Sequence, residues 1–437
     1  MGVSLAVVAL SRDLILHLYR RAGFGAEAAE IERAQSDGWA ATVTRLVHAL
    51  HHPERYANVI APPQFAPLSV EGLSTSSTLR STEFLALTNW WIEMMSASQA
   101  PLLEKLVLLY HCQFPTGYSK VNRPSLMYQQ NQLFRQSGMG TFTDLALAVA
   151  RDPSMLIWLD SQSNIAAHPN ENFARELMER FAMGVGHYSE DDVKAAARCF
   201  TGWTLNNVTG AFSYNITEHD VGQKTLLGRS GPLTGSQAVE IICRTEASAR
   251  WVVSRFFSWL AYPVSPRGSE VTDLLPVFLG HRKMVPLIEA ILNHPAFVSE
   301  KATTGLIKQP IEWVVGTLRA LHLSPADFPS GYIANILAEL GQRLFDPPTV
   351  GGWGDNTYWL SSATSLVQLK FAQTVASTTK NLGEISSGSG RRRLHDTARL
   401  LGVSSWSHGT ATALQAASNT PTRLLTLALV SPEYLAN

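Results

Sequence analysis

Apolar residues recur three or four positions apart along most of this chain, a spacing that places them on one face of an α-helix. Residues 13–23 carry Leu14, Leu18 and Ala22 at steps of four and end at Gly23, which stops a helix. The same periodicity predicts further helices over residues 26–39, 80–95, 101–114, 141–152, 170–183, 189–203, 236–260, 270–280, 283–293, 306–322 and 331–344, and at the C-terminal end. The pattern therefore predicts a mainly α fold.

Three stretches interrupt this periodicity. Residues 60–76 are rich in proline and serine and predict a long loop. Around residues 204–235, asparagine, threonine, glycine and β-forming residues predict an irregular excursion that carries a small β-hairpin. Residues 346–360 form a loop rich in proline, glycine and tryptophan. Long irregular segments within compact proteins are often functional, so the last two are candidates to surround a site.

The same signals predict the domain organisation. Residues 1–11 are expected to extend ahead of the first helix, and residues 12–380 to form a single large multi-helix domain. Glycine and serine near residues 381–396 predict a flexible linker. Residues 397–437 are expected to form C-terminal helices that pack on the main domain.

Composition narrows the classes of partner. Lys+Arg and Asp+Glu number 35 each, so no overall field attracts nucleic acid, and no nucleic-acid partner is expected. Only 16% of residues are charged while tryptophan reaches 11, which indicates an extensive core, an apolar groove or a subunit interface in a homo-oligomer. Three widely spaced cysteines provide neither a zinc framework nor a disulfide scaffold.

Export and membrane signals are weak. No stretch approaches the roughly 18 uninterrupted apolar residues that a membrane span needs, so no membrane span is expected. The opening MGVSLAVVAL is apolar but lacks a basic region before it and a clear cleavage site after it. A cytoplasmic location is therefore expected, with export through a degenerate signal peptide as the alternative.

Residues 167–180, AHPNENFARELMER, concentrate acidic and basic side chains. Glu171, Arg175 and Glu179 lie four apart, as do Glu176 and Arg180, so the polar face of this helix can be a solvated surface laced with ion pairs. The high apolar content favours the opposite interpretation, in which neighbours cover this face and its carboxylates must be paired or must hold a metal or a substrate. Both interpretations stay open at this point.

Several sequence blocks resemble one family. They are LHLYRRAGFG (16–25), PLLEKLVLLYHCQF (101–114), PNENFARELMERFAMGVGHYSEDDVKAAARCFTGW (169–203), HDVGQKTLLG (219–228) and GQRLFDPPTVGGWGDNTYWL (341–360). In this order they are similar to the bacterial family catalogued as domain of unknown function 1800, over about residues 12–375. The resemblance implies little chemistry, although many members look exported and are encoded beside sulfatase-like partners. Tyr110, Cys112 and Gln113 depart from the Trp, Asn and second His of the family, which leaves His111 alone.

The leading functional hypothesis is a divalent metal ion, iron, manganese, zinc or copper, held between helices. Carboxylates from two helices with histidine are the ligand types of helical metal sites. The predicted ligands are Glu104, His111, Glu171, Glu176, His219 and Asp220. Structural alternatives exist for each: His111 as a packed core histidine, Glu104 as an ion-pair partner, and the 219–220 pair as a loop anchor. If the two histidines of the family bind one metal, this chain has either lost one ligand or uses Gln113 as a weak oxygen ligand.

Two further hypotheses need no metal. In the first, Glu171 or Glu176 acts with Asp220 as an acid–base pair on a glycoside-like substrate, while Lys224 and Arg175 anchor an anionic group. In the second, the acidic helix and the tryptophan loop form a non-catalytic binding or scaffold surface. Trp203, Trp353 and Trp359 belong to the core or form the floor of a pocket. The sequence favours a metal-dependent enzyme, an oxidoreductase more than a hydrolase, acting on a small-molecule or peptide-like substrate.

Overall fold

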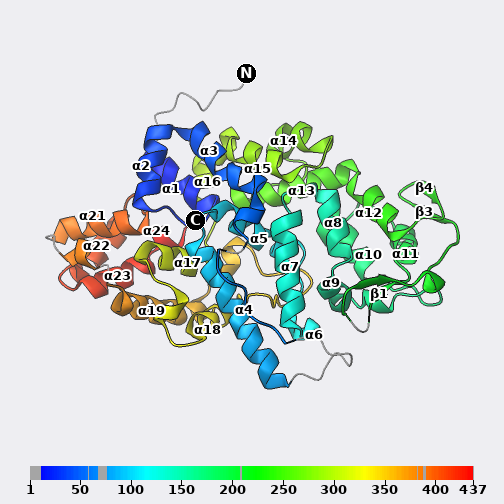
Figure 1. Ribbon diagram of the computed structural model, residues 1–437. Helices are drawn as coiled ribbons and strands as arrows, with labels where there is room; N and C mark the ends of the chain where they lie inside the picture. Colours follow the sequence, from blue (N-terminus) through cyan, green and yellow to red (C-terminus); the bar gives the residue numbers. More distant parts are fainter. Residues whose placement is uncertain are drawn as a thin grey trace.

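The computed structural model of the chain describes residues 11–57, 59–66, 76–206, 209–380, 382–386 and 390–436. The expected mainly α fold is confirmed, because helices make up most of these residues and the named strands are four short ones (Figure 1). Residues 1–10 of the predicted extension, and parts of the predicted loop at 60–76, lie outside the described ranges.

The helices of the first half are short to medium in length. They are α1 (Arg12–Arg21), α2 (Ala28–Asp37), α3 (Trp39–His48), α4 (Ser77–Ala97), α5 (Pro101–Gln113), α6 (Tyr118–Val121), α7 (Pro124–Ser137), α8 (Phe142–Ala150), α9 (Pro153–Trp158), α10 (Asn172–Glu176) and α11 (Glu190–Cys199). A π-helical turn, Leu177–Ala182, continues α10. The periodicity did not single out α7, whose apolar residues are spread among glutamines and asparagines.

The helices of the second half follow the strands. They are α12 (Gly235–Cys243), α13 (Glu246–Leu260), α14 (Ser269–Leu279), α15 (Met284–Leu292), α16 (Glu300–Thr304), α17 (Pro310–Leu321), α18 (Tyr332–Glu339), α19 (Ser362–Thr378), α20 (Gly383–Ser386), α21 (Gly390–Leu401), α22 (His408–Ala417), α23 (Pro421–Leu429) and α24 (Pro432–Leu435). The single helix predicted over 236–260 is thus two helices. Thr245 separates them because its side chain accepts from the Ser248 amide and begins α13.

The irregular excursion near 204–235 carries two small antiparallel hairpins where one was expected. Strand β1 (Trp203–Leu205) pairs with β2 (Phe212–Tyr214), with Trp203 opposite Tyr214. Strand β3 (Lys224–Leu226) pairs with β4 (Arg229–Gly231). In Figure 1 both hairpins lie at one end of the molecule with α10 and α11, and α21–α23 lie at the other end.

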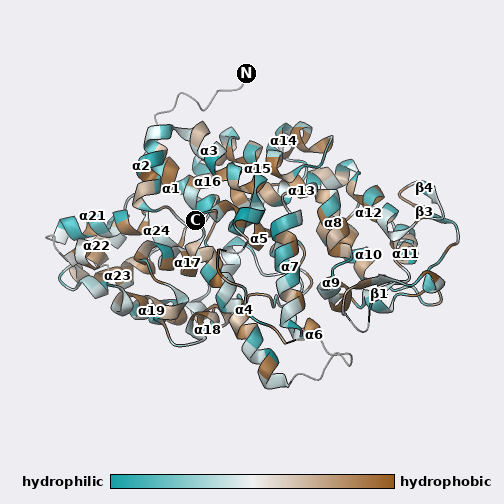
Figure 2. Ribbon diagram, in the orientation of Figure 1, coloured by the Kyte–Doolittle hydropathy of each residue, from teal (hydrophilic) through white to brown (hydrophobic). Residues whose placement is uncertain are grey.

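Helix α5 occupies the interior near the middle of the molecule (Figure 1) and packs against α3, α4 and α7. Every residue from Pro101 to Gln113 is buried, including the charged Glu104 and Lys105. By contrast, α4 and α7 alternate hydrophilic and hydrophobic residues along their length (Figure 2), as helices with one solvated face do. Polar groups on α5 therefore have to find their partners inside the protein.

The C-terminal helices share the core of the rest of the chain. One cluster of buried apolar residues runs from Ile15 to Tyr434. The segment predicted as a flexible linker, 381–396, instead contains α20 and the first residues of α21, while residues 387–389 lie outside the described ranges. Helix α21 forms because it packs against α17, α22 and α23, which the glycine and serine content did not reveal. Among the described residues, no helix is both long and apolar enough to cross a bilayer.

Candidate functional site

Glu104 and His111 lie on the same face of α5, as their spacing of seven predicted, and that face meets α7. Arg135 of α7 donates to both carboxylate oxygens of Glu104, at 2.9 and 2.8 Å, and neither side chain is exposed. The same guanidinium donates to Asn131 Oδ1, and Asn131 Nδ2 lies 3.2 Å from His111 Nε2. Glu104, Arg135, Asn131 and His111 are thus linked in series by polar contacts. This arrangement fits Glu104 as an ion-pair partner and His111 as a packed core histidine.

The environment of His111 is aromatic. Its ring packs against Trp91, Phe134 and Phe345, with centroids 4.5 to 5.3 Å away. Burial, assisted by the positive charge of Arg135, lowers the pKa of His111 to about 3. The imidazole is therefore neutral at physiological pH.

The three departures from the family pattern on α5 have structural partners or a buried setting. Gln113 donates to the carbonyl of Phe181 in the π-helical turn, and its Oε1 has no hydrogen-bond partner among the described residues. Tyr110 donates to the carbonyl of Gly138. Burial raises the pKa of the Cys112 thiol, so this cysteine is not a thiolate nucleophile at rest. Gln113 and His111 also contact different neighbours, the π-helical turn and α7 respectively.

The acidic helix that opens the family signature faces partly outward. Arg175 donates to Glu171 Oε2 at 3.0 Å and, at 2.9 and 2.6 Å, to both oxygens of Glu190, at the start of α11. Glu176 is more covered, with 16% of its side chain exposed, and forms an ion pair with Arg180 at 3.1 Å. Burial raises the pKa of Glu176, and Arg180 opposes that rise. Glu171 and Arg175 thus belong to a surface ion-pair network.

His219, Asp220 and Lys224 hold the excursion against the C-terminal end of α11. His219 Nδ1 lies 2.9 Å from the carbonyl of Thr201, and Arg198 donates to both carboxylate oxygens of Asp220 at 2.6 and 3.2 Å. The Lys224 ammonium, whose side chain is fully buried, donates to the carbonyls of Asp220, Gly222 and Leu233. An ammonium has three N–H donors, so Lys224 has none left for an anionic substrate. Its predicted anchoring role does not fit this geometry.

The six predicted metal ligands therefore lie in three separate places. Glu171 is connected through Arg175 to Glu190, at the start of α11. Asp220 is paired with Arg198, near the end of the same helix. Glu190 and Arg198 are eight residues apart, which is roughly 12 Å along a helix that rises 1.5 Å per residue. Glu104 and His111 are enclosed between α5 and α7. Among the described residues, no three His, Cys, Asp or Glu side chains form a group that could hold a metal ion. The metal stays a prediction, without a ligand cluster behind it.

A different set of residues surrounds a cavity of about 280 Å³, which we call the tryptophan cavity. One wall is the face of α13 that carries Trp251, Arg255 and Trp259, four residues apart. The Arg255 guanidinium lies 4.4 Å from the centre of the Trp259 ring and 5.9 Å from that of Trp251. The Nε of Arg255 and the Nε1 of Trp259 are buried without hydrogen-bond partners among the described residues. This wall combines aromatic rings with unused donors.

Two carboxylates also line the cavity. Glu312 lies in the first turn of α17, where it accepts from the Gln309 amide at 2.8 Å and forms an ion pair with buried Lys105 of α5. Asp355 belongs to the loop at 346–360, is about half exposed, and lies 3.6 Å from Arg255 Nη1. The formal charges of these four side chains cancel. Burial lowers the pKa of Lys105, and Glu312 opposes that effect.

Asn356 closes the cavity by joining the two segments on either side of it. Its side chain accepts from the Ile307 amide at 2.9 Å and donates to the Gly305 carbonyl at 3.0 Å, as a neighbouring strand would. The residue adopts a positive φ of 51°, which asparagine tolerates better than most residues. Pro263 and Val264 add apolar surface to the rim.

The cavity connects to the family signature through the π-helical turn. Trp251 Nε1 donates to the carbonyl of Arg180 at 2.9 Å, so the signature helix fixes one ring of the cavity wall. π-helical turns occur often at functional sites because they displace carbonyls from the regular helix pattern. The two carbonyls displaced here, Arg180 and Phe181, accept from Trp251 and Gln113.

Comparison with known protein families identifies the family of this chain. The model of the family "Protein of unknown function (DUF1800)" matches residues 17–436, nearly the whole chain. The chain belongs to this family. No curated protein and no solved structure matches it.

In this DUF1800 protein, three of the family blocks, 101–114, 169–203 and 341–360, meet at the C-terminal end of α5 beside the tryptophan cavity. The loop at 346–360 packs on the end of α5, where a Cβ at Gly352 would lie 3.5 Å from the Cys112 carbonyl. Trp353 and Trp359, predicted as core or pocket floor, are buried and do not line the cavity, and Trp203 packs on Phe200 and Phe212.

Sequence reasoning missed Trp251, Arg255, Trp259 and Glu312 as site residues. The spacing of the first three along one helix was a usable signal, since residues i, i+4 and i+8 share a face. Glu312 gave no such signal, because its place in the wall depends on how α17 packs against α5.

Proposed function

We propose that this DUF1800 protein binds a neutral sugar or small glycoside in the tryptophan cavity. The observation that carries the proposal is the pairing of two tryptophan rings with Arg255, Glu312 and Asp355 around one hollow. A pyranose ring has an apolar face that packs on indole and a rim of hydroxyls that hydrogen-bond to carboxylates and guanidinium groups. The charges of Glu312 and Asp355 are balanced by Arg255 on the wall and by Lys105, which pairs with Glu312 from outside the lining, and this balance favours an uncharged ligand over an ionic one.

Asp355 is the group best placed for acid–base work on such a ligand. Its carboxylate is half exposed and close to Arg255, whereas Glu312 is engaged by Lys105 and the Gln309 amide. Glycoside hydrolysis uses carboxylates on opposite sides of the scissile bond, so Asp355 and Glu312 are the pair to test. This places the acid–base hypothesis on residues other than Glu171, Glu176 and Asp220.

Binding is tested by titrating the protein with glucose, N-acetylglucosamine and their β-1,4-linked disaccharides in a calorimeter. We expect saturable binding of at least one of them, weakened about tenfold or more by Arg255→Leu, since a lost buried hydrogen-bonding side chain costs at least about 1.4 kcal/mol. Asp191→Asn, whose side chain is almost fully exposed on α11, is the control and should bind as the wild type does. Absence of saturable binding by all four sugars would refute the proposal.

Turnover is tested separately with aryl glycosides of the sugar that binds. Asp355→Asn should retain binding and lose release of the aryl group if Asp355 acts as the acid or base. If the wild type binds the sugar and releases nothing, the protein is a binding protein and the hydrolytic step is wrong.

The metal-dependent oxidoreductase favoured by the sequence stays a prediction, as do a peptide-like substrate, a homo-oligomer and the cytoplasmic location. Elemental analysis of protein purified without chelator or added metal tests the first of these directly. Near-stoichiometric iron, manganese, zinc or copper would favour it over the sugar-binding proposal.

A further inference from the structure

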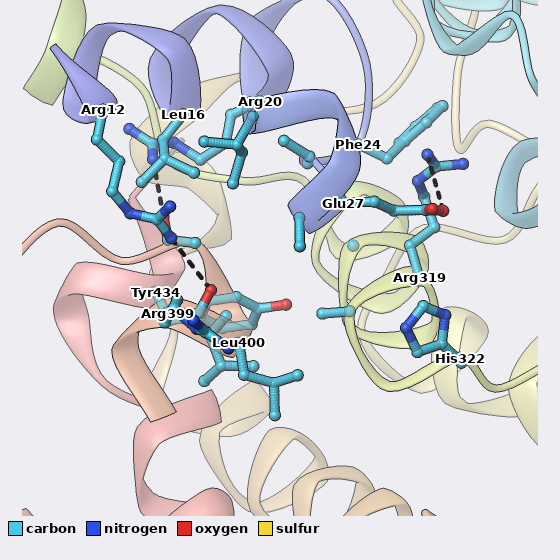
Figure 3. A pocket seen from close by; sticks show the side chains of 18 of the residues that line it. Arg12, Leu16, Arg20, Phe24, Glu27, Arg319, His322, Arg399, Leu400 and Tyr434 are labelled. Carbon is cyan, nitrogen blue, oxygen red and sulfur yellow. Dashed lines mark hydrogen bonds and ion pairs between the residues drawn. The ribbon is translucent and has the colours of Figure 1, made fainter. Parts of the chain in front are cut away.

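A second cavity, of about 290 Å³, lies near the other end of α17, and we call it the arginine cavity. Helices α1, α2, α17 and α21 surround it, together with Lys308 and Tyr434. Figure 3 shows Arg12, Arg20, Arg399 and Tyr434 on one side of the hollow and Glu27, Arg319 and His322 on the other. It shares no lining residue with the tryptophan cavity.

Positive charge on the wall exceeds negative charge. The wall carries five Arg or Lys side chains and the carboxylates Glu27 and Glu32. The charge of Arg319 is balanced by two carboxylates, because Glu27 and Glu30 lie 3.7 and 3.8 Å from its Nη2. Glu32 is exposed to solvent. The side of the cavity that holds Arg12, Arg20 and Lys308 thus has no buried carboxylate among the residues that line the wall.

The donors on this side are only partly used. Arg20 donates from Nη1 to the Gly402 carbonyl at 3.2 Å, while its Nε is buried without a partner among the described residues. Lys308, which is 8% exposed, donates to the Tyr434 carbonyl and lies 3.8 Å from the centre of the Tyr434 ring. An ammonium has three donors, so Lys308 retains donors for a ligand.

A second layer of positive charge lies behind the wall. Arg21 is completely buried and donates to the Ala302 carbonyl, yet its Nε and Nη1 have no partner among the described residues. Burial lowers the pKa of Arg21 to about 9 and that of Arg20 to about 10, so both stay charged at neutral pH. Burial also lowers the pKa of Lys308 well below its ordinary value; the charges of Arg20, Lys105 and Arg21 add to that effect, and Glu312 opposes it. Like charges gathered in a covered place are costly unless an anion accompanies them.

We propose that the arginine cavity binds a phosphate group, with Arg12, Arg20 and Lys308 as its donors. A phosphate monoester carries close to two negative charges and three acceptor oxygens, which matches several cations with unused donors. The cavity is larger than a phosphate ion, and Leu16, Phe24 and Leu400 give it apolar surface. A small organic phosphate therefore fits it better than the free ion does.

The probes are inorganic phosphate, phenyl phosphate and benzoate, each compared with sodium chloride at matched ionic strength. We expect both phosphates to raise the melting temperature of the full chain saturably, with phenyl phosphate binding more tightly because its ring covers the apolar wall. Equal affinity for the two phosphates would still support phosphate binding, with the free ion as the ligand. If benzoate binds as tightly as phenyl phosphate, the preference for phosphate is wrong.

Variants locate the site. Arg20→Gln and Arg12→Gln should each weaken binding of phenyl phosphate by about tenfold or more, because each removes a charged donor. Arg12 is only half-buried, so its variant provides a test even if changes at Arg20 or Lys308 impair folding. Arg244→Gln on α12, whose side chain is 72% exposed, is the matched control and should leave binding unchanged. A phosphate effect of equal size in the wild type, Arg12→Gln and Arg20→Gln would overturn the proposal.

Discussion

Asp152 has a local role as a helix cap, but its pKa is set by burial, which depends on packing with other parts of the chain. The sequence Asp-Pro is typical of a helix start, and Asp152 is indeed the N-cap of α9, accepting from the Met155 amide at 2.9 Å. Packing then covers it almost completely and adds a hydrogen bond from Gln130 at 2.7 Å. Burial raises the pKa of Asp152 to about 7 despite these hydrogen bonds. The helix predicted over 141–152 ended at Asp152, so neither this cap nor the raised pKa was predicted, although Asp-Pro carries a signal for the cap.

Asp152 should make the stability of the protein fall as pH rises through the range from about 4 to about 7. In that range the folded protein holds a proton that the unfolded chain, with a pKa of 3.8, has released, so folding becomes less favourable with rising pH. Asp152→Asn removes this dependence and should gain stability relative to wild type between pH 4 and 8, approaching about 4 kcal/mol. Urea unfolding at several pH values measures the difference.

The measurement to use is the difference in unfolding free energy between the wild type and Asp152→Asn. The wild-type curve alone is ambiguous because His17 and His111 change stability with pH in the direction opposite to Asp152. Burial lowers the pKa of each to about 3, so each makes stability rise with pH from about 3 to 6.5. Both histidines are present in the variant and the wild type, and their effects cancel in the comparison. A pH-independent difference would mean that Asp152 is ionised in the folded protein throughout this range.

At the scale of the helix, α5 and α10 show why a pattern of charges does not by itself define a site. Helix α5 carries Glu104 and His111 seven residues apart, α10 carries Glu171 and Glu176 at its two ends, and we predicted all four as ligands of one metal. Tertiary packing buries α5 on every side, and there Glu104 forms a buried ion pair with Arg135. Glu171 remains at the surface, where it pairs with Arg175. The periodicity predicted which residues share a helix face, but not what that face would meet.

Because Glu104 is buried and Glu171 is at the surface, the same Glu→Gln substitution should lower the free energy of unfolding by different amounts at the two positions. Glu104→Gln should lower the free energy of unfolding by about 3–5 kcal/mol, because it leaves the Arg135 charge buried and unpaired. Glu171→Gln should cost about 1 kcal/mol or less, since its partner remains solvated and keeps Glu190. Denaturant unfolding of both variants provides the comparison, and a double variant Glu104→Gln with Arg135→Met should recover part of the loss. Equal costs for the two glutamates would contradict the assigned burial.

At the scale of the whole molecule, distant parts of the chain depend on one another. The Ile307 backbone pairs with Ala436, the Lys308 amide donates to the Leu435 carbonyl, and Trp313 Nε1 donates to the Leu429 carbonyl. Tyr434 is buried beside Thr317, 3.1 Å from its hydroxyl. Backbone pairing and a shared core thus join the C-terminal helices to the rest of the chain.

Because the C-terminal helices share this core, the chain should unfold in one transition. Tyr434→Ala should lower stability by about 3 kcal/mol, since it empties a buried aromatic site. Circular dichroism, which reports helices throughout, and tryptophan fluorescence should shift together in the variant. A separate early transition affected only by Tyr434→Ala would show that α21–α24 unfold independently.

The helical fold, the family, most of the helices and the lack of a strong charge imbalance could be predicted, because these depend on residue types and on neighbours along the chain. Which polar groups are enclosed depends on tertiary packing. Packing places Arg255 beside two indoles, sets Glu312 against Lys105, and gathers Arg12, Arg20 and Lys308 around a hollow. The physical reason is that desolvation and pairing of charges depend on contacts between segments tens to hundreds of residues apart, and helical periodicity carries no information about those contacts.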